Sequence, residues 1–378
     1  MSKLSFFKKK EFFLIIFLLV ACFSFVDTIL KSLMNGCDFQ WQPATLMWSG
    51  INHYEKFISQ GNFDFSCQGG QYAHFFHVLL YPFTLVEWEI ARIMWLITNI
   101  FFVFMIPIMV SQQLGISKYK AIILILIFIT CYPARMTLNY GQQSLFVLFF
   151  LLFSNFTNNK LLITFSGFSY IKYSTGYILF LDYLIKKKFK SLFLSCLPYT
   201  LGWLVYFIYT DSNWLTNFFE PIHWIMQTGY SRTGDLYSIL QIYVLKNNIG
   251  NYLSYFLILI IIALNILILH QINSIKHTFL KFSLVIILPL IFLPHSNYDY
   301  VLLFPLLSYS FLNYGLLINK VNFYFVVYYF YINRLVRHLI NTDEIYQPIM
   351  MILMTTLVFI NIIYNKKNKQ QLTNINKV

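Results

Sequence analysis

Charged residues are scarce in this chain, and their scarcity excludes a soluble globular protein. Asp, Glu, Lys and Arg together make up 11% of the 378 residues, against about 25% in a typical soluble domain. Hydrophobic residues reach 58% and gather in long runs. The length suits about twelve crossings of about 20 residues each, so we expect an all-α polytopic membrane protein that forms one domain.

Several motifs of soluble enzymes are also absent. The sequence has no P-loop, no GxSxG, no HExxH and no paired cysteines at zinc spacing, which leaves hydrolase and nucleotide-driven functions without support. Cys37 and Cys67 fall in one loop and could pair if that loop faces an oxidising compartment. We expect no cofactor and no metal, because His53, His74 and His77 place only two ligands on one short helix.

Basic residues outnumber acidic ones, 27 to 14, and membrane orientation explains the excess better than nucleic-acid binding does. Lysines at 8–10 precede a first span at about 12–30, which predicts a cytosolic N-terminus, an uncleaved anchor and an outer first loop. The apolar stretch 75–86 is short for a crossing. If it crossed, Lys118 and Lys120 would lie outside, so we expect an interfacial helix in the membrane plane.

This orientation gives a regular map of a multi-pass protein of the cell (inner) membrane with both termini in the cytosol. Stretch 161–185 has lysines on both flanks, so we expect two half-spans with Lys172 at the turn, lining a protein cavity. The expected segments are a first span in 1–32, an extracytoplasmic loop with the in-plane helix in 33–91, the remaining transmembrane bundle in 92–364, a cytosolic tail in 365–378, and outer loops at 135–143, 211–250 and 295–299.

All the arginines fall on the predicted outer side, whereas most lysines fall on the cytosolic side. Orientation alone would place both residue types inside. Arginine is the preferred bidentate partner of phosphate, so its positions indicate an anionic ligand at the outer face. The alternative is that these side chains reach outer lipid headgroups. The arginines are Arg92, Arg135, Arg232, Arg334 and Arg337.

Five segments on the predicted outer side contain charged or polar residues suited to catalysis, and they could converge on one cavity. A carboxylate there would deprotonate an acceptor hydroxyl, while cations would stabilise a departing phosphate. Apolar walls would suit a donor carried on a lipid. The alternative for the carboxylate, Asp38, is a helix cap. The elements are Asp38, the loop from Arg135 to Gly141-Gln142-Gln143, Lys172, His295 with Asp299, and Arg334 with Arg337.

The order of these residues resembles glycosyltransferase family 87, membrane enzymes of the GT-C class that use polyprenyl-phosphate sugars. The resemblance covers most of residues 36–190 and is patchy afterwards. His53 stands where the family usually has proline, and Ala73-His74 replace a typical Pro-Pro. The matching residues are Asp38-Phe39, Ala44, Gly50-Ile51-Asn52-His53-Tyr54, Tyr72, Tyr81-Pro82, Arg92, Trp95, Gly141-Gln142, Lys172 ahead of Lys186-Lys187-Lys188, and His295 with Asp299-Tyr300.

The resemblance implies a GT-C-type bundle and an inverting hexosyltransferase, commonly of mannose, with Asp38 as general base at the extracytoplasmic face. The expected partners are a polyprenyl-phosphate-linked sugar donor, a lipid-linked or envelope glycan acceptor and membrane lipids, with no nucleic acid. We expect the donor phosphate to bind Arg135, Lys172, His295, Arg334 and Arg337, and the substrates to contact Tyr54, Tyr72, Gln142 and Asp299.

Two other functions stay open. A transporter or flippase of a lipid-linked sugar would also have broken spans, but it predicts inverted repeats and a charged pathway through both leaflets. A structural partner in an envelope-synthesis complex would leave the Asp38 loop dispensable.

Overall fold

The computed structural model describes residues 2–35, 39–60, 72–155, 159–215, 218–221, 234–240, 251–340 and 343–375. Most residues in these ranges are helical and none lies in a strand, which confirms the expected all-α class. A helix satisfies its own backbone hydrogen bonds, and an apolar chain in lipid has few other ways to do so.

Five helices are long and apolar enough to cross a membrane among the described residues. Only 17% of the most apolar window of α1 or α12 is buried, so these two helices present wide apolar faces to lipid. A sixth span is formed if α7 (Lys118–Thr130) and α8 (Tyr132–Asn139) count together, although they meet at a bend of 57°. The long helices are α1 (Ser2–Asn35), α6 (Trp88–Gln113), α12 (Phe189–Thr210), α15 (Asn251–Asn273) and α21 (Asp343–Ile375).

The remaining apolar stretches form shorter helices, and some of these, such as α9, are buried within the bundle. Broken helices are tolerated in membrane proteins where neighbouring protein rather than lipid surrounds them, and eight of the ten residues of α9 are buried. A count of about twelve crossings therefore stays a prediction. The shorter elements are α9 (Ser144–Phe153), α10 (Lys160–Ser166), η1 (Gly167–Ile171), α11 (Tyr173–Ile185), α16 (Thr278–Val285), α17 (Leu288–Phe292), η3 (Asn297–Leu303), α18 (Phe304–Leu312), α19 (Leu317–Val327), the π-helical η4 (Tyr328–Ile332) and α20 (Asn333–Ile340).

The predicted break at Lys172 is confirmed. Residue 172 has an extended backbone, φ −111° and ψ 100°, between the 3-10 helix η1 and α11. The predicted outer loop 135–143 is corrected in part, because its first half is helical. Pro133 fits at the start of α8, since the first turn of a helix needs no N–H from that residue.

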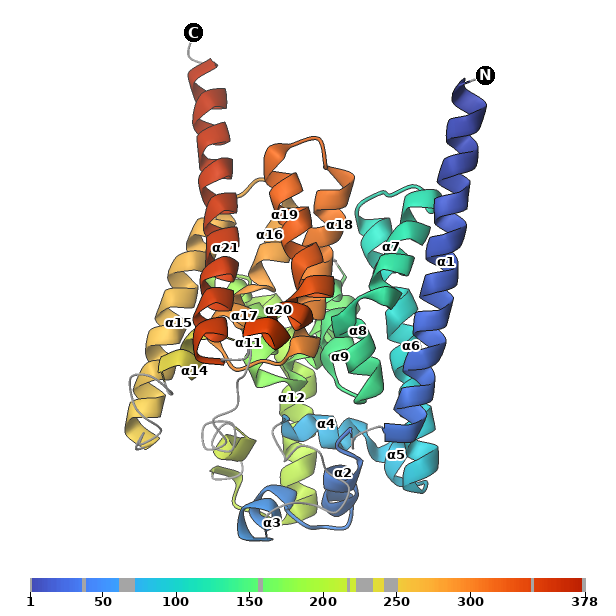
Figure 1. Ribbon diagram of the computed structural model, residues 1–378. Helices are drawn as coiled ribbons and strands as arrows, with labels where there is room; N and C mark the ends of the chain where they lie inside the picture. Colours follow the sequence, from blue (N-terminus) through green and yellow to red (C-terminus); the bar gives the residue numbers. More distant parts are fainter. Residues whose placement is uncertain are drawn as a thin grey trace.

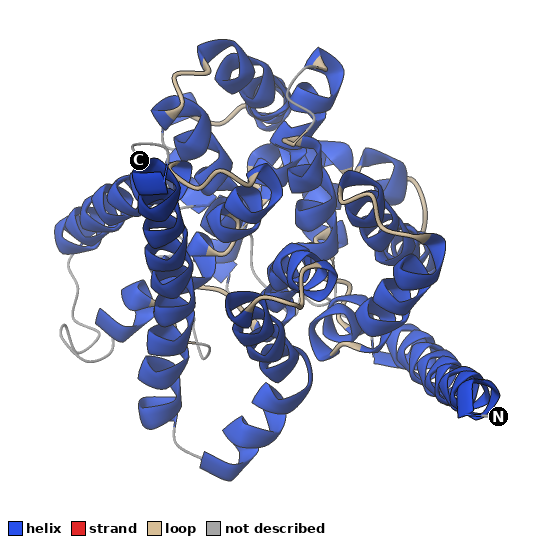
Figure 2. Cartoon of the chain, turned by 90° about the horizontal axis from the view of Figure 1, so that it is seen from above, coloured by secondary structure: helices blue, strands red, loops and turns tan. Residues whose placement is uncertain are grey.

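The first-loop helices gather at the end of the bundle opposite both termini (Figure 1). Seen from above, α1 stands at the edge of the bundle (Figure 2). The stretch predicted as one in-plane helix forms α4 and α5, of six and four residues. Neither is long enough to cross a membrane, and their depth stays a prediction. The helices at this end are α2 (Trp41–Trp48), α3 (His53–Gln60), α4 (His74–Leu79) and α5 (Tyr81–Thr84), while the four-residue α14 (Leu236–Ile239) lies beside α15.

Candidate active site

The turn between α8 and α9, residues 140–144, joins most of the predicted site. Gly141 has a φ of +61°, a left-handed conformation that glycine adopts without steric cost. Its carbonyl accepts a hydrogen bond of 2.8 Å from the indole N–H of Trp95 on α6. The next three side chains, from Gln142 to Ser144, are buried and each binds a different part of the chain.

Gln142 and Gln143 bind the two ends of the first loop. The Tyr72 hydroxyl donates to Gln142 Oε1 at 3.3 Å, and Gln143 Nε2 donates to the Phe39 carbonyl at 3.1 Å. The Phe39 ring stacks on Trp95, with centroids 4.9 Å apart and an interplanar angle of 10°. Asp38 itself lies outside the described residues, but the residue that follows it is fixed by these two contacts.

Ser144 continues the turn into a buried ion pair. Its hydroxyl donates to Asp299 Oδ1 at 2.5 Å. The Lys172 ammonium donates to both oxygens of the same carboxylate, at 2.5 and 2.7 Å. The side chains of Lys172 and Asp299 are 12% and 1% exposed, so water contributes little to either charge, and the second Asp299 oxygen also accepts from the Ser296 amide at 2.8 Å.

Local structure explains why Lys172 reaches this place. It stands at the N-terminal end of α11, and its neighbour Ile171 accepts a backbone hydrogen bond of 2.8 Å from the Ala73 amide. This bond ties the end of the first loop to the break in the helix. The Lys172 ammonium also lies 4.9 Å from the centroid of the Tyr298 ring, a cation–π contact that suits a partly buried cation.

His295 lies near this ion pair, as predicted from the sequence order. It is buried, its Nδ1 lies 3.2 Å from the Leu293 carbonyl oxygen, and its ring packs on Tyr300. Burial lowers the pKa of His295, and the charges of Asp235 and Asp299 oppose that shift. Asp235 is fully buried and accepts from the Ser238 amide through Oδ1, so a further carboxylate faces the His295 side of the site.

The three predicted phosphate-binding arginines have other partners. Arg135 donates to Asp27 Oδ2 at 3.0 Å and to the Thr28 hydroxyl at 2.9 Å, which ties α8 to α1. Arg334 lies over the Tyr132 ring and Arg337 over the Tyr346 ring, at 5.1 and 5.8 Å from the centroids. Their binding of phosphate stays a prediction, and within the described ranges no contact joins them to Lys172.

A second polar cluster lies in the first loop around Asn52. Asn52 Nδ2 donates to Glu220 at 3.2 Å, and its Oδ1 accepts from the Tyr206 hydroxyl at 3.0 Å. Burial raises the pKa of Glu220 to about 7 and lowers that of His53, whose Nδ1 lies 3.0 Å from the Tyr206 oxygen. The predicted substrate contact Tyr54 is fully buried beside this cluster, and its hydroxyl donates to the Tyr72 carbonyl.

Three of these residues were missed in the sequence. Ser144 follows directly after the glutamines and begins an apolar run, which reads as a helix start. Asp235 and Glu220 lie in the long acidic loop after α12, where nothing in the local pattern separates a buried carboxylate from a solvated one. Their roles depend on neighbours that are remote in the chain.

A protein-family model described as glycosyltransferase family 87 matches residues 71–294. The match covers more than half of the chain, from the residue before Tyr72 to the residue before His295, and includes the α8–α9 turn and Lys172. Neither a curated protein nor a solved structure matches the chain significantly. The chain therefore belongs to glycosyltransferase family 87, and it is an integral membrane glycosyltransferase.

Proposed function

We propose that this protein transfers a hexose, specifically mannose, with inversion from a polyprenyl-phosphate donor to a hydroxyl of a lipid-linked or envelope glycan acceptor. The observation that carries the proposal is the α8–α9 turn. Gln143 holds the carbonyl of Phe39, next to Asp38, and the adjacent Ser144 holds the Asp299 carboxylate that binds Lys172. Consecutive residues of one turn thus bind Phe39, which follows the candidate base in the chain, and Asp299, which pairs with the candidate phosphate-binding cation.

In the proposed reaction Asp38 acts as the general base. As the acceptor oxygen bonds to the anomeric carbon, its proton passes to the Asp38 carboxylate. The bond from that carbon to the phosphate oxygen breaks on the opposite face, and its electron pair leaves with the phosphate. One base and one leaving group on opposite faces give inversion in a single displacement.

Lys172 and His295 would receive the departing phosphate. The Lys172 ammonium has three N–H groups, and Asp299 engages two of them through its two oxygens. The third can donate to a phosphate oxygen, where positive charge stabilises the charge that develops. In this proposal Asp299 is a positioning residue, because its oxygens are occupied by Lys172, Ser144 and the Ser296 amide.

The proposal places the reaction at the extracytoplasmic face. Both termini lie at one end of the bundle and the first-loop helices at the other, which agrees with cytosolic termini and an outer Asp38 loop. Cysteine-accessibility labelling tests the orientation. We expect residues 36–70, 136–142, 211–248 and 295–299 to be labelled from outside, and 113–120 and 186–190 only after permeabilisation. Labelling of 113–120 from outside would contradict it.

Purified protein in nanodiscs, a polyprenyl-phosphate hexose and a set of glycolipid acceptors test the chemistry. Asp38→Asn keeps the shape of the side chain and removes the base, so we expect kcat to fall by about 10²–10⁴-fold. Asp64→Asn makes the same change in the same loop and should leave transfer unchanged. Equal transfer rates for wild type and Asp38→Asn would exclude Asp38 as the base.

Loss of the contact between Lys172 and the donor phosphate should change the donor KM rather than kcat. Lys172→Gln should raise the donor KM by about 10- to 100-fold, since one charged hydrogen bond contributes about 1.5–3 kcal/mol. Unchanged donor kinetics would remove Lys172 from the phosphate site. Movement of the donor lipid across the bilayer without any transfer would instead favour the flippase function.

A further inference from the structure

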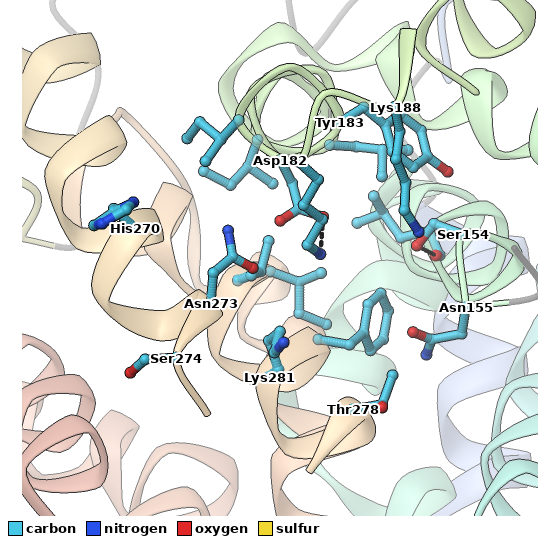
Figure 3. Close-up of a pocket in the computed structure, with 18 residues that line it drawn as sticks. Ser154, Asn155, Asp182, Tyr183, Lys188, His270, Asn273, Ser274, Thr278 and Lys281 are labelled. Carbon is cyan, nitrogen blue, oxygen red and sulfur yellow. Dashed lines mark hydrogen bonds and ion pairs between the residues drawn. The ribbon is translucent and has the colours of Figure 1, made fainter. Parts of the chain in front are cut away.

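The structure contains a cavity of about 740 Å³, whose lining residues are drawn in Figure 3. The cavity lies at the opposite end of α9 and α11 from the Lys172–Asp299 pair. Ser144 begins α9 and Lys172 caps α11, whereas Ser154 and Lys186 at the other ends of the same helices line the cavity. The 13 residues of α11 span about 20 Å at about 1.5 Å per residue. The cavity is therefore separate from the candidate active site.

Three turns at one end of the bundle contribute residues to the lining of this cavity. They follow α9, join α11 to α12, and join α15 to α16, and the last of these lies toward the two termini in Figure 1. The volume is within the range of about 300–1,000 Å³ that small-molecule sites occupy. The predicted orientation places all three turns on the cytosolic side.

Cations in the cavity exceed the carboxylates that could neutralise them. Lys186 is paired with Asp182 at 2.5 Å. Lys188 and Lys281 also line the cavity, and no carboxylate of the described ranges forms an ion pair with either. The charges of Lys186 and Lys188 repel the Lys281 ammonium and the charge of Asp182 attracts it, so a bound anion would add to the attraction that one carboxylate supplies.

The same cavity holds acceptors that lack donors. Asp182 is only 7% exposed, and its Oδ1 has no hydrogen-bond partner among the described residues. The same holds for the buried Oδ1 of Asn273. Figure 3 shows Asp182, Asn273 and Lys281 around one space. A buried acceptor without a donor is destabilising, so a ligand that fits this site brings hydroxyl donors as well as negative charge.

The rest of the lining combines polar side chains, among them Ser154, Asn155 and His270, with an apolar part. The apolar part includes Leu151, Ile178, Leu179, Phe282, Val285 and Ile286, which suit an acyl or prenyl chain, and the polar side chains beside it suit a hydroxylated headgroup. We propose that this cavity binds a phosphate ester that carries free hydroxyl groups, with the ester oxygens on Lys188 and Lys281 and the hydroxyls on Asp182 and Asn273. The two sources of that chemistry are a hydroxylated anionic lipid such as phosphatidylglycerol and a soluble glycerol phosphate ester. The inference concerns a second site and does not depend on the proposed transfer reaction.

Binding to the full-length protein in detergent, measured by native mass spectrometry, tests the proposal with three probes. Phosphatidylglycerol offers phosphate and hydroxyls, phosphatidylcholine offers a neutralised phosphate without hydroxyls, and glycerophosphoglycerol offers the headgroup alone. We expect phosphatidylglycerol to bind about tenfold or more tightly than phosphatidylcholine, because charged hydrogen bonds contribute about 1.5–3 kcal/mol each. Saturable binding of glycerophosphoglycerol alone would support the site and assign it to the soluble ester.

The matched variants are Lys188→Gln/Lys281→Gln in the cavity and Lys118→Gln/Lys120→Gln outside it, both on the predicted cytosolic side. The cavity variant should weaken binding of the preferred probe by about 10- to 100-fold or more, and the control should change it by less than about twofold. Lys188 is exposed, so the single variant Lys188→Gln serves if the double variant fails to fold. Equal binding by the cavity and control variants, or no saturable binding of any probe, would overturn the proposal.

Discussion

The Lys172–Asp299 pair gives the sharpest test of how the site is held together. We consider Asp299→Asn, which keeps the size of the side chain and removes its charge. In the wild type the carboxylate accepts from the Lys172 ammonium, the Ser144 hydroxyl and the Ser296 amide, all at 2.5–2.8 Å. Asparagine has one acceptor oxygen, so its amide group must face one of these donors.

The size of the effect follows from burial. With Lys172 only 12% exposed, water cannot replace the lost carboxylate, and removal of one partner of a buried pair costs about 3–5 kcal/mol. Lys172→Met/Asp299→Asn removes both charges and should be less destabilised than Asp299→Asn. The two substitutions should therefore couple by about 2 kcal/mol or more, as contacting residues do in a double-mutant cycle.

Unfolding by SDS from maltoside micelles would measure the apparent free energy for the wild type, the two single variants and the double variant. Asp211→Asn is the matched control, because Asp211 is exposed at the end of α12 and its φ of +45° suits asparagine. That control should change the free energy by less than about 0.5 kcal/mol. Equal losses for Asp299→Asn and Asp211→Asn, or strict additivity in the cycle, would refute the reasoning.

Two further predictions concern the first-loop end. Burial raises the pKa of Glu220 from 4.5 to about 7, so the folded protein keeps a proton that the unfolded chain releases, and the free energy of unfolding should fall as the pH rises from about 4.5 to about 7. SDS unfolding of the wild type should show this fall across the pH range, and Glu220→Gln should show a smaller fall because it lacks the titrating carboxyl group. Identical pH profiles for the two proteins would contradict the prediction. Gly202→Ala would place a Cβ 2.0 Å from Phe75 Cβ and should cost about 1–3 kcal/mol, whereas Gly315→Ala meets no atom within 4 Å and should cost nothing; similar thermal stability of the two variants would be the adverse result.

Much of the site could be predicted because polar groups are costly in an apolar chain. A lysine inside a hydrophobic stretch predicted a break at Lys172, and the structure has one there. The Gly141–Gln143 turn, Lys172 and Asp299 were expected to meet, and hydrogen bonds through Gln143 and Ser144 link them to the first loop. In such a sequence each charged residue must lie near a partner or near water, so its position helps to predict which segments meet.

The remaining features depend on pairing over long distances in the chain. The pairing of Arg135 with Asp27, which is 108 residues earlier, could not be predicted, because no local pattern selects that partner from the other acids. Helix lengths were equally hard to predict, because a buried short helix and a lipid-facing long helix have the same apolar composition. The helical first half of the 135–143 loop follows from Pro133 at a helix start, a signal that the basic and amide residues after it obscured.

The Lys172–Asp299 pair also constrains how the protein enters the membrane during synthesis. Its two residues are 127 positions apart, which at about 5–20 residues per second takes the ribosome about 6–25 s. Until η3 has been made, the ammonium between η1 and α11 has no carboxylate beside it, and burial without that partner is costly. The segment 160–185 is therefore expected to stay near the aqueous boundary and to settle into the bundle only after η3 has been made. A nascent chain stalled before residue 299 should leave this segment accessible to soluble reagents.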